Sequence, residues 1–167
     1  MNKTPARPGP PYARPAMEGA VRLQCVITTN KFEQERRAGC ENVIELHGSV
    51  FQNRCPHCGE YYTVEDMKQG GTIPKCRICG SIIRPLVSLY GEMVDSRIMT
   101  RTTEEIGKAQ VLLLIGTTLQ SEIFSNYIRY YSGNQLVVIH REEHYTDQKA
   151  DMALIGDPGE ILAKLNY

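Results

Sequence analysis

Two Cys-x-x-Cys pairs, separated by 17 residues, constrain the fold of this chain more than any other feature of its sequence. The first pair is Cys55 and Cys58, and the second is Cys76 and Cys79. Each pair can offer two thiolates to one metal ion, and this spacing is typical of a zinc ribbon. We therefore predict that residues 55–83 form a zinc ribbon with one Zn²⁺ bound by all four cysteines. Because four ligands fill a tetrahedral shell, we expect this ion to stabilise structure and to take no part in catalysis.

The rest of the sequence bears on whether these cysteines bind metal or form disulfides. The N-terminus has no apolar central region of the kind that marks a secretory signal. Paired cysteines in a chain without such a signal indicate metal binding in a reducing compartment. We therefore predict a cytoplasmic location. Two disulfides or four unrelated thiols are the alternatives to the zinc site.

Charge and hydropathy limit the partners of the chain. Lys plus Arg and Asp plus Glu each total 19, so no net field would attract nucleic acid or an anionic membrane. The longest strongly apolar run, residues 111–115, is far shorter than the roughly 20 residues that a membrane-spanning helix needs. We predict no direct nucleic-acid partner and no membrane span.

The chain divides into a tail, an α/β domain and the inserted ribbon. Residues 1–20 contain five of the nine prolines and no acidic residue before Glu18, so we predict a disordered Pro/Arg-rich tail. From residue 21 onward, short apolar runs alternate with stretches of helix-compatible composition, which indicates an α/β domain made of residues 21–54 and 84–167. The expected strands are residues 24–28, 111–115 and 136–139, and the expected helices are residues 96–110, 120–132 and 158–165.

Several short motifs surround the ribbon in a fixed order. They are Arg-Ala-Gly at 37–39 with the segment 43–49 that ends in His-Gly-Ser, Arg-Pro at 84–85 with Leu-Tyr-Gly-Glu at 89–92, Gly-Thr-Thr-Leu at 116–119, and Ala-Asp at 150–151 with the segment 156–162. Each motif is weak by itself. Their set, their order and the position of the ribbon together resemble the sirtuin family, the NAD-dependent protein-lysine deacylases.

The resemblance implies both a fold and an activity. The fold is a Rossmann-like parallel sheet with an inserted zinc-ribbon module, and NAD and an acyl-lysine peptide or protein meet between the two parts. The activity is transfer of the acyl group from lysine to ADP-ribose, with release of nicotinamide. The expected cofactors are therefore a structural Zn²⁺ and NAD.

The resemblance also assigns roles to residues. His47 would be the general base on a ribose hydroxyl, a task that suits imidazole because its pKa of about 6.5 is near the working pH, and Gly48 beside it would leave room for the ribose. Independently of the family, Gly116 ends an apolar strand, where ligands of open α/β sheets bind. The expected NAD contacts are Asn30, Gly116, Thr117, Thr118, His140 and Pro158, and the expected acyl-lysine contacts are Val87, Tyr90 and Gly91.

The sequence departs from the family pattern at several positions. None of its 14 glycines forms a Gly-x-Gly sequence, so the first strand and the phosphate-binding loop are expected to be missing and NAD binding to be weak. Phe32 stands where the family has an aspartate that binds the nicotinamide amide. Glu35 replaces a histidine, and His140 replaces an asparagine that contacts the adenosine ribose.

These departures leave three hypotheses. The first is a sirtuin deacylase whose recorded sequence is incomplete at its N-terminus, because of a frameshift or a mistaken start. The second is a non-catalytic sirtuin-like protein that keeps a peptide groove or scaffold surface. The third is a zinc-ribbon interaction module with no nucleotide site.

Overall fold

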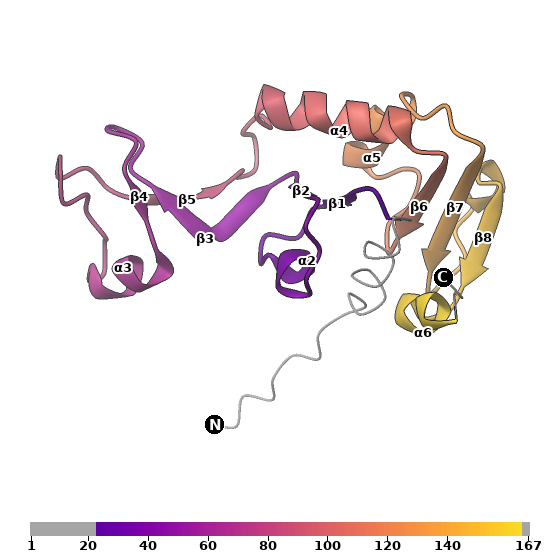
Figure 1. The fold of residues 1–167 in the computed structure, drawn as a ribbon, viewed down its shortest axis with the longest axis horizontal. Coiled ribbons are helices and arrows are strands. Elements are labelled where there is room, and N and C mark those ends of the chain that lie inside the picture. Colours follow the sequence, from indigo (N-terminus) through magenta and orange to yellow (C-terminus); the bar gives the residue numbers. More distant parts are fainter. Residues whose placement is uncertain (1–22, 165–167) are drawn as a thin grey trace.

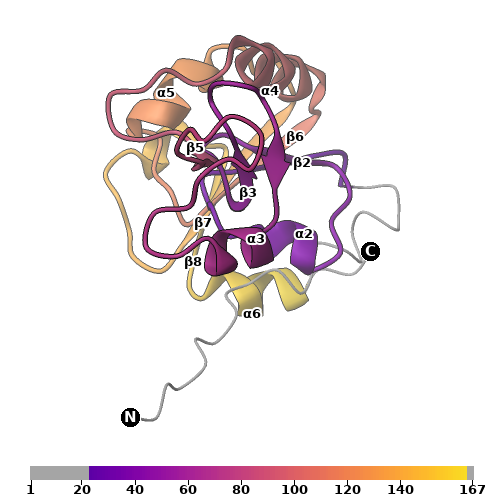
Figure 2. The ribbon, with the colours of Figure 1, turned by 90° about the vertical axis from the view of Figure 1, so that its left-hand side faces the viewer.

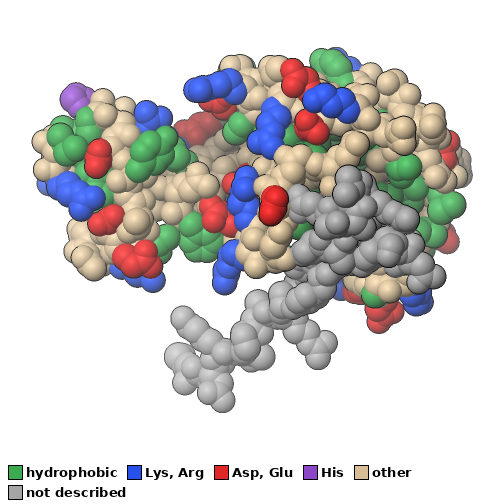
Figure 3. All heavy atoms as spheres, viewed as in Figure 1, with side chains coloured by type: hydrophobic (Ala, Val, Ile, Leu, Met, Phe, Trp, Pro, Cys, Tyr) green, Lys and Arg blue, Asp and Glu red, His purple; other side chains and the backbone are tan. Residues whose placement is uncertain are grey.

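A computed structural model describes residues 23–164, so the predicted tail at 1–20 lies outside the described residues. Figure 1 shows an elongated molecule with a small antiparallel module at one end and a parallel sheet flanked by helices at the other. Within residues 23–164, no helix has the length and apolar character that crossing a bilayer requires. Acidic and basic side chains are interspersed over the face shown in Figure 3.

Parallel strands form two separate sheets. The first pairs β1 (Val26–Thr28) with β2 (Val43–Glu45), and the second has the strand order β6 (Val111–Ile115), β7 (Gln135–His140), β8 (Met152–Ile155). The predicted α/β class with Rossmann-like parallel strands is confirmed. Among the described residues, β1 pairs only with β2 and β6 only with β7, so each of these two apolar strands has one edge without a partner strand.

Helices cover both faces of the β6-β7-β8 sheet. Side chains alternate along a strand, so successive residues of β7 pack into different clusters. Val138 packs with α5 (Glu122–Ile128) through Phe124 and Ile128. Ile139 packs on the other face with Leu162 of α6 (Pro158–Ala163).

The observed helices begin near the predicted positions and end earlier. Helix α4 (Ser96–Lys108) begins after Asp95, whose carboxylate accepts a hydrogen bond from the Arg97 amide, as N-cap residues do. Its end follows from the extended backbone of Ala109. Outside the antiparallel sheet, the sequence prediction named no helix at α2 (Gln34–Arg37) or α3 (Val64–Gln69) and no strand at β2 or β8.

An antiparallel sheet carries the cysteines. Its strand order is β4 (Tyr61–Tyr62), β3 (Gly48–Arg54), β5 (Arg84–Val87), and an isolated bridge joins Lys75 to Ile82. Figure 2, seen along the long axis, places this module in front of the parallel strands. Strand β3 starts beside the α/β part and ends at Arg54, next to Cys55, so one strand connects the parallel sheet to the metal module.

Gly48 is required where β3 meets β5. Its φ is +68°, and a Cβ at this position would lie 1.9 Å from the Leu86 carbonyl oxygen. The prediction was that this glycine leaves room for ribose; the structure gives a different reason, which is close approach of the β5 backbone. We expect Gly48→Ala to lower the free energy of unfolding by at least about 2 kcal/mol, from the combined clash and left-handed backbone. Urea denaturation measures this loss, and an unchanged midpoint would contradict it.

Candidate functional site

The four cysteines converge in the antiparallel module, as predicted. Their Sγ atoms all lie within 4.8 Å of one another, with 3.5 Å between Cys55 and Cys79 and 3.4 Å between Cys58 and Cys76. Zn–S bonds of about 2.3 Å in a tetrahedron place sulfurs about 3.8 Å apart, so this arrangement fits Zn²⁺. His57, within the first pair, is exposed and outside the cluster.

Electrostatics in the cluster also favours a cation. The Ser81 hydroxyl and amide lower the pKa of Cys79 to about 5. The Glu60 amide favours ionised Cys58, but the nearby sulfur of Cys76 opposes it, and the pKa of Cys58 rises to about 12. Four thiolates this close repel one another unless a cation balances them. The Tyr62 hydroxyl donates a 3.1 Å hydrogen bond to Cys76 Sγ, which supports one ligand from outside the cluster.

His47 lies in the turn between β2 and β3. Its carbonyl accepts a hydrogen bond from the Ser88 amide at 3.0 Å, which ties the turn to the end of β5. The side chain is half-buried, and burial, followed by the positive charge of Lys31, lowers the pKa of the imidazole below 6.5. A neutral imidazole is the form that can accept a proton.

The loop after β1 lies beside this turn. The Val50 amide donates to the Lys31 carbonyl at 3.0 Å, so the loop and β3 are fixed to each other. Asn30 Oδ1 accepts from the Phe32 amide at 2.9 Å, and the Asn30 amide donates to Thr28 Oγ1 at 3.1 Å. The Asn30 side chain therefore stabilises its own loop, whereas the Phe32 ring is 54% exposed.

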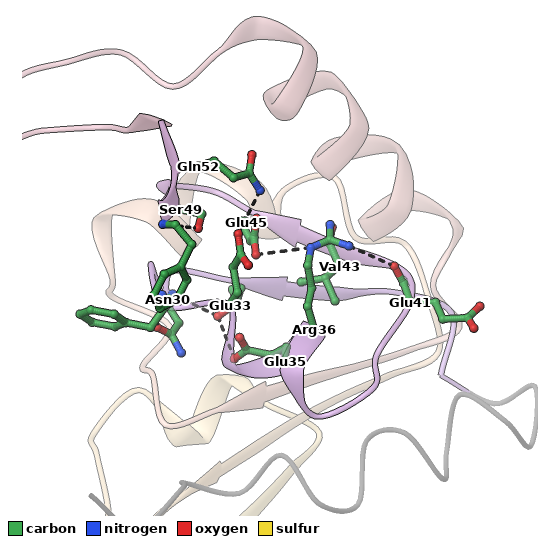
Figure 4. A network of polar contacts seen from close by, with 12 residues as sticks. Asn30, Glu33, Glu35, Arg36, Glu41, Val43, Glu45, Ser49 and Gln52 are labelled. Carbon is green, nitrogen blue, oxygen red and sulfur yellow. Dashed lines mark hydrogen bonds and ion pairs between the residues drawn. The ribbon is translucent and has the colours of Figure 1, made fainter. Parts of the chain in front are cut away.

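A network of polar contacts lies beside this loop (Figure 4). Thr28 Oγ1 donates to Glu35 Oε1 at 3.0 Å, so the residue that replaces the family's histidine is buried and bonded to β1. Arg36 lies 3.4 Å from Glu45 and donates to the Val43 carbonyl at 2.8 Å. Burial nevertheless raises the pKa of Glu45.

The carboxyl end of the β6-β7-β8 sheet holds a second group of predicted residues. Gly116 has φ +67°, and no atom lies within 4 Å of a Cβ built there, so its surroundings are open. Thr117 and Thr118 follow it and are half-buried. His140, at the end of β7, is 7% exposed. Pro158 is buried at the start of α6 and contributes to packing.

Asp147 also lies in this second group, although no pattern in the sequence indicated it. Its Oδ2 lies 3.0 Å from His140 Nε2 and also accepts from the His144 amide at 2.8 Å. It comes from η2 (Asp147–Lys149), a 3₁₀ helix that follows β7. The partnership is spatial, so no motif marks it.

The predicted acyl-lysine residues lie at and after β5. Val87 is half-buried, Gly91 has φ +84° with open surroundings, and Tyr90 is fully exposed. Glu92 fixes the loop between them because it forms an ion pair with Arg84 at 3.0 Å and accepts from the Leu89 amide. Val87 lines a cleft of about 810 Å³, and Tyr90 is not among the residues that line it.

Two hollows flank the loop 88–95. The larger one lies against β2, β3 and β5, and the smaller, of about 530 Å³, lies between α4 and α5. Met93 lines both. Apolar side chains predominate in the smaller hollow, among them Val94, Met99, Ile123 and Tyr127.

Predicted functional residues thus follow parallel strands in both sheets. Asn30 follows β1, His47 follows β2, Gly116 follows β6, and His140 ends β7. Backbone hydrogen bonds join the loop of Asn30 to β3, the strand that follows the His47 turn, and join Gly116 to the end of β7 beside His140. The carboxyl ends of parallel strands are where α/β folds bind ligands.

Comparisons of the sequence with known proteins all indicate one family. A model of the Sir2 family matches residues 13–122. An NAD-dependent protein deacetylase of Clostridium acetobutylicum is 35% identical over 152 residues, which cover 90% of this chain and 62% of the relative. An NAD-dependent protein deacylase 1 of Archaeoglobus fulgidus is 34% identical over 145 residues, covering 86% of this chain and 59% of the relative. The chain therefore spans about three fifths of the length of these relatives.

Solved structures agree with this comparison. A Sir2 homologue in complex with NAD superposes with a TM-score of 0.83 at 32% identity, covering 95% of this chain and 63% of the other. A structure that describes the basis of sirtuin substrate affinity has a TM-score of 0.87 at 28% identity. The match covers 95% of this chain and 68% of the other.

Proposed function

Because this chain belongs to the Sir2 family, the sirtuins, we propose that it acts in NAD-dependent deacylation of acyl-lysine in a protein or peptide. The observation that carries the proposal is the arrangement of His47: a half-buried imidazole with a lowered pKa, at the carboxyl end of β2 and fixed to the Asn30 loop and to β5. NAD supplies the ADP-ribose that accepts the acyl group. His47 accepts a proton from a ribose hydroxyl, and the zinc module holds the paired strands β3 and β5, to which the His47 turn is joined.

The loop 88–95 is the proposed docking site of the peptide. Gly91 is exposed and has no side chain, so a peptide backbone can approach it closely, and the hollows on both sides of the loop offer space for substrate side chains. Tyr90, fully exposed without a ligand, is the residue whose surface a bound acyl-lysine would cover.

The residues at the strand ends provide the proposed NAD contacts. Gly116, Thr117 and Thr118 offer backbone amides and hydroxyls beside open space, and His140 offers a ring nitrogen. The Asn30 side chain is engaged with its own loop, so it acts by shaping the loop. Four reduced thiols at the metal site fit a reducing compartment, and we propose the cytoplasm.

Nicotinamide release tests the proposed function. The chain is incubated with NAD and an acetyl-lysine peptide, and free nicotinamide is measured by chromatography with and without the peptide. Peptide-dependent release is the expected result. Equal release with an unacetylated peptide, or none at any NAD concentration, would refute the proposal.

Phe32 is expected to weaken NAD binding. A phenyl ring neither donates nor accepts a conventional hydrogen bond, so it cannot bind the nicotinamide amide. We expect Phe32→Asp to lower the NAD dissociation constant about tenfold, the effect of one charge-assisted hydrogen bond. Calorimetric titration measures this change. Phe32→Leu, which stays apolar, is the matched control, and an equal gain in both variants would show that ring removal and not hydrogen bonding is responsible.

A further inference from the structure

Arginine side chains gather around the larger cleft, the one of about 810 Å³ against β2, β3 and β5. Its lining includes five arginines and three acidic residues, a net charge of +2, whereas the whole chain has no net charge. The arginines are Arg36, Arg54, Arg84, Arg97 and Arg101, and the acidic residues are Glu45, Glu92 and Asp95. The cleft is therefore a local positive region on a protein without net charge.

Each of the three acidic residues is already paired with an arginine. These ion pairs are Arg36–Glu45, Arg84–Glu92 and Arg97–Asp95, with N···O distances of 3.4, 3.0 and 3.6 Å. Arg54 donates to the Gly59 carbonyl at 3.1 Å, and its guanidinium lies over the Tyr61 ring. Arg101 donates to Asn42 Oδ1. Within residues 23–164 these partners are neutral, so two exposed arginines of the cleft have no carboxylate.

The arginines of the cleft also stand next to one another in like-charge pairs. Arg54 of β3 lies directly opposite Arg84 of β5 in the antiparallel pairing. Arg97 and Arg101 are four residues apart in α4, so they share one face of that helix. Like charges at either of these spacings destabilise the elements that carry them. An anionic group bound in the cleft would relieve both repulsions.

We propose that the cleft binds carboxylates of the substrate, so that the chain prefers an acyl-lysine with Asp or Glu about two to four residues away. The preference rests on the proposed function. Ser88, Glu92 and Met93, from the proposed peptide-docking loop 88–95, also line the cleft. Arg84 precedes Val87 by three positions in β5, about 10 Å along an extended strand, and an extended peptide covers that distance in about three residues.

A nucleic-acid strand fits the cleft less well than an acidic peptide does. Its affinity for a protein comes from the neutralisation of many phosphates, whereas only two arginines here lack a carboxylate. The carboxylates of Glu92 and Asp95 in the same lining would also repel a continuous row of phosphates. Two separate carboxylates of a peptide can instead reach Arg54 and Arg101 individually.

Peptide binding to the full chain tests the preference. Three fluorescein-labelled peptides carry one acetyl-lysine, with glutamate, glutamine or lysine at the second to fourth positions on both sides, and fluorescence anisotropy gives their affinities. The glutamate peptide should bind about fivefold more tightly than the glutamine peptide, the effect of two partly exposed ion pairs. The difference should vanish between 0.1 and 1 M salt, because the screening length falls from about 10 to about 3 Å. Equal affinities at low salt, or tighter binding of the lysine peptide, would overturn the proposal.

A pair of variants assigns the preference to the cleft. Arg101→Gln should reduce the glutamate preference to about twofold, because one of the two ion pairs is lost. Lys108→Gln is the matched control: it removes one positive charge from the same helix, outside the cleft lining, and should leave the preference unchanged. An equal reduction in both variants would overturn the assignment to the cleft. Should Arg101→Gln fail to fold, the wild-type peptide series still decides the preference.

Unacetylated versions of the same peptides separate this inference from the proposed function. Discrimination for acetyl-lysine without a glutamate preference would overturn the inference and leave the proposed function standing. A glutamate preference without discrimination for acetyl-lysine would contradict the proposed function and support an acid-binding cleft. Displacement of the glutamate peptide by a single-stranded DNA oligonucleotide that binds more tightly would overturn the choice of a peptide as the partner. Absence of binding by every peptide would contradict both.

Discussion

Replacing Cys76 by serine is expected to abolish stoichiometric zinc and to unfold the antiparallel module. Cys76 is buried, its Sγ lies 3.4 Å from that of Cys58, and it accepts a hydrogen bond from the Tyr62 hydroxyl. Its loss therefore removes a metal ligand and the acceptor of that hydrogen bond at once. Structural zinc sites contribute apparent binding free energies of about 10–16 kcal/mol that are available only to the folded chain. Bound zinc per chain should fall at least about tenfold from a value near one.

Elemental analysis of reduced protein measures the zinc content, and circular dichroism with and without a chelator measures the accompanying loss of structure. Cys25→Ser is the matched control, because Cys25 is half-buried and outside the cluster. It should retain full zinc content. Wild-type protein without zinc, or Cys76→Ser protein with one equivalent, would contradict the metal assignment.

Replacing His47 by alanine is expected to reduce the deacylation rate about 10²–10⁴-fold, the contribution of a positioned general base. NAD affinity should change little, because a base acts on the transition state more than on the bound ground state. His57→Ala is the control: this histidine is exposed in the metal module, away from the strand ends, and its loss should leave the rate unchanged. Similar rates for His47→Ala and wild type would show that His47 is structural.

The pH profile gives a separate test of His47. Burial and Lys31 lower the pKa of this imidazole below 6.5, so the neutral, proton-accepting form persists to lower pH than for a free histidine. As the pH falls through that lowered pKa, the ring becomes protonated and the rate should fall. An acid limb centred above 6.5 would contradict this assignment.

Local sequence signals predicted the metal ligands and the buried parallel strands. The cysteine spacing specified the cluster, and the continuous apolar run at 111–115 predicted β6 with its observed bounds. The missed strand β8 is an unbroken apolar run, Met-Ala-Leu-Ile, so its sequence did carry the signal, although the strand is short and mostly exposed. Helix α3 did have a signal, the Thr63 and Asp66 capping box.

Contacts between distant residues explain what the sequence could not predict. Gly48 is required by a carbonyl of Leu86, which no local pattern around Gly48 reveals. Asp147 contacts His140 because the chain after β7 folds back and places η2 beside the end of that strand. Tyr90 was identified from its motif, but its full exposure depends on the conformation of the whole loop 88–95.

Product stoichiometry tests the central claim, NAD-dependent transfer of an acyl group, most directly. The chain is incubated with millimolar NAD and an acetyl-lysine peptide, and mass spectrometry follows the deacetylated peptide, nicotinamide and O-acetyl-ADP-ribose over time. We expect the three to form in equal amounts, and only when NAD is present. Deacetylated peptide without NAD, or with free acetate and no acetylated ADP-ribose at the earliest times, would contradict the proposed function.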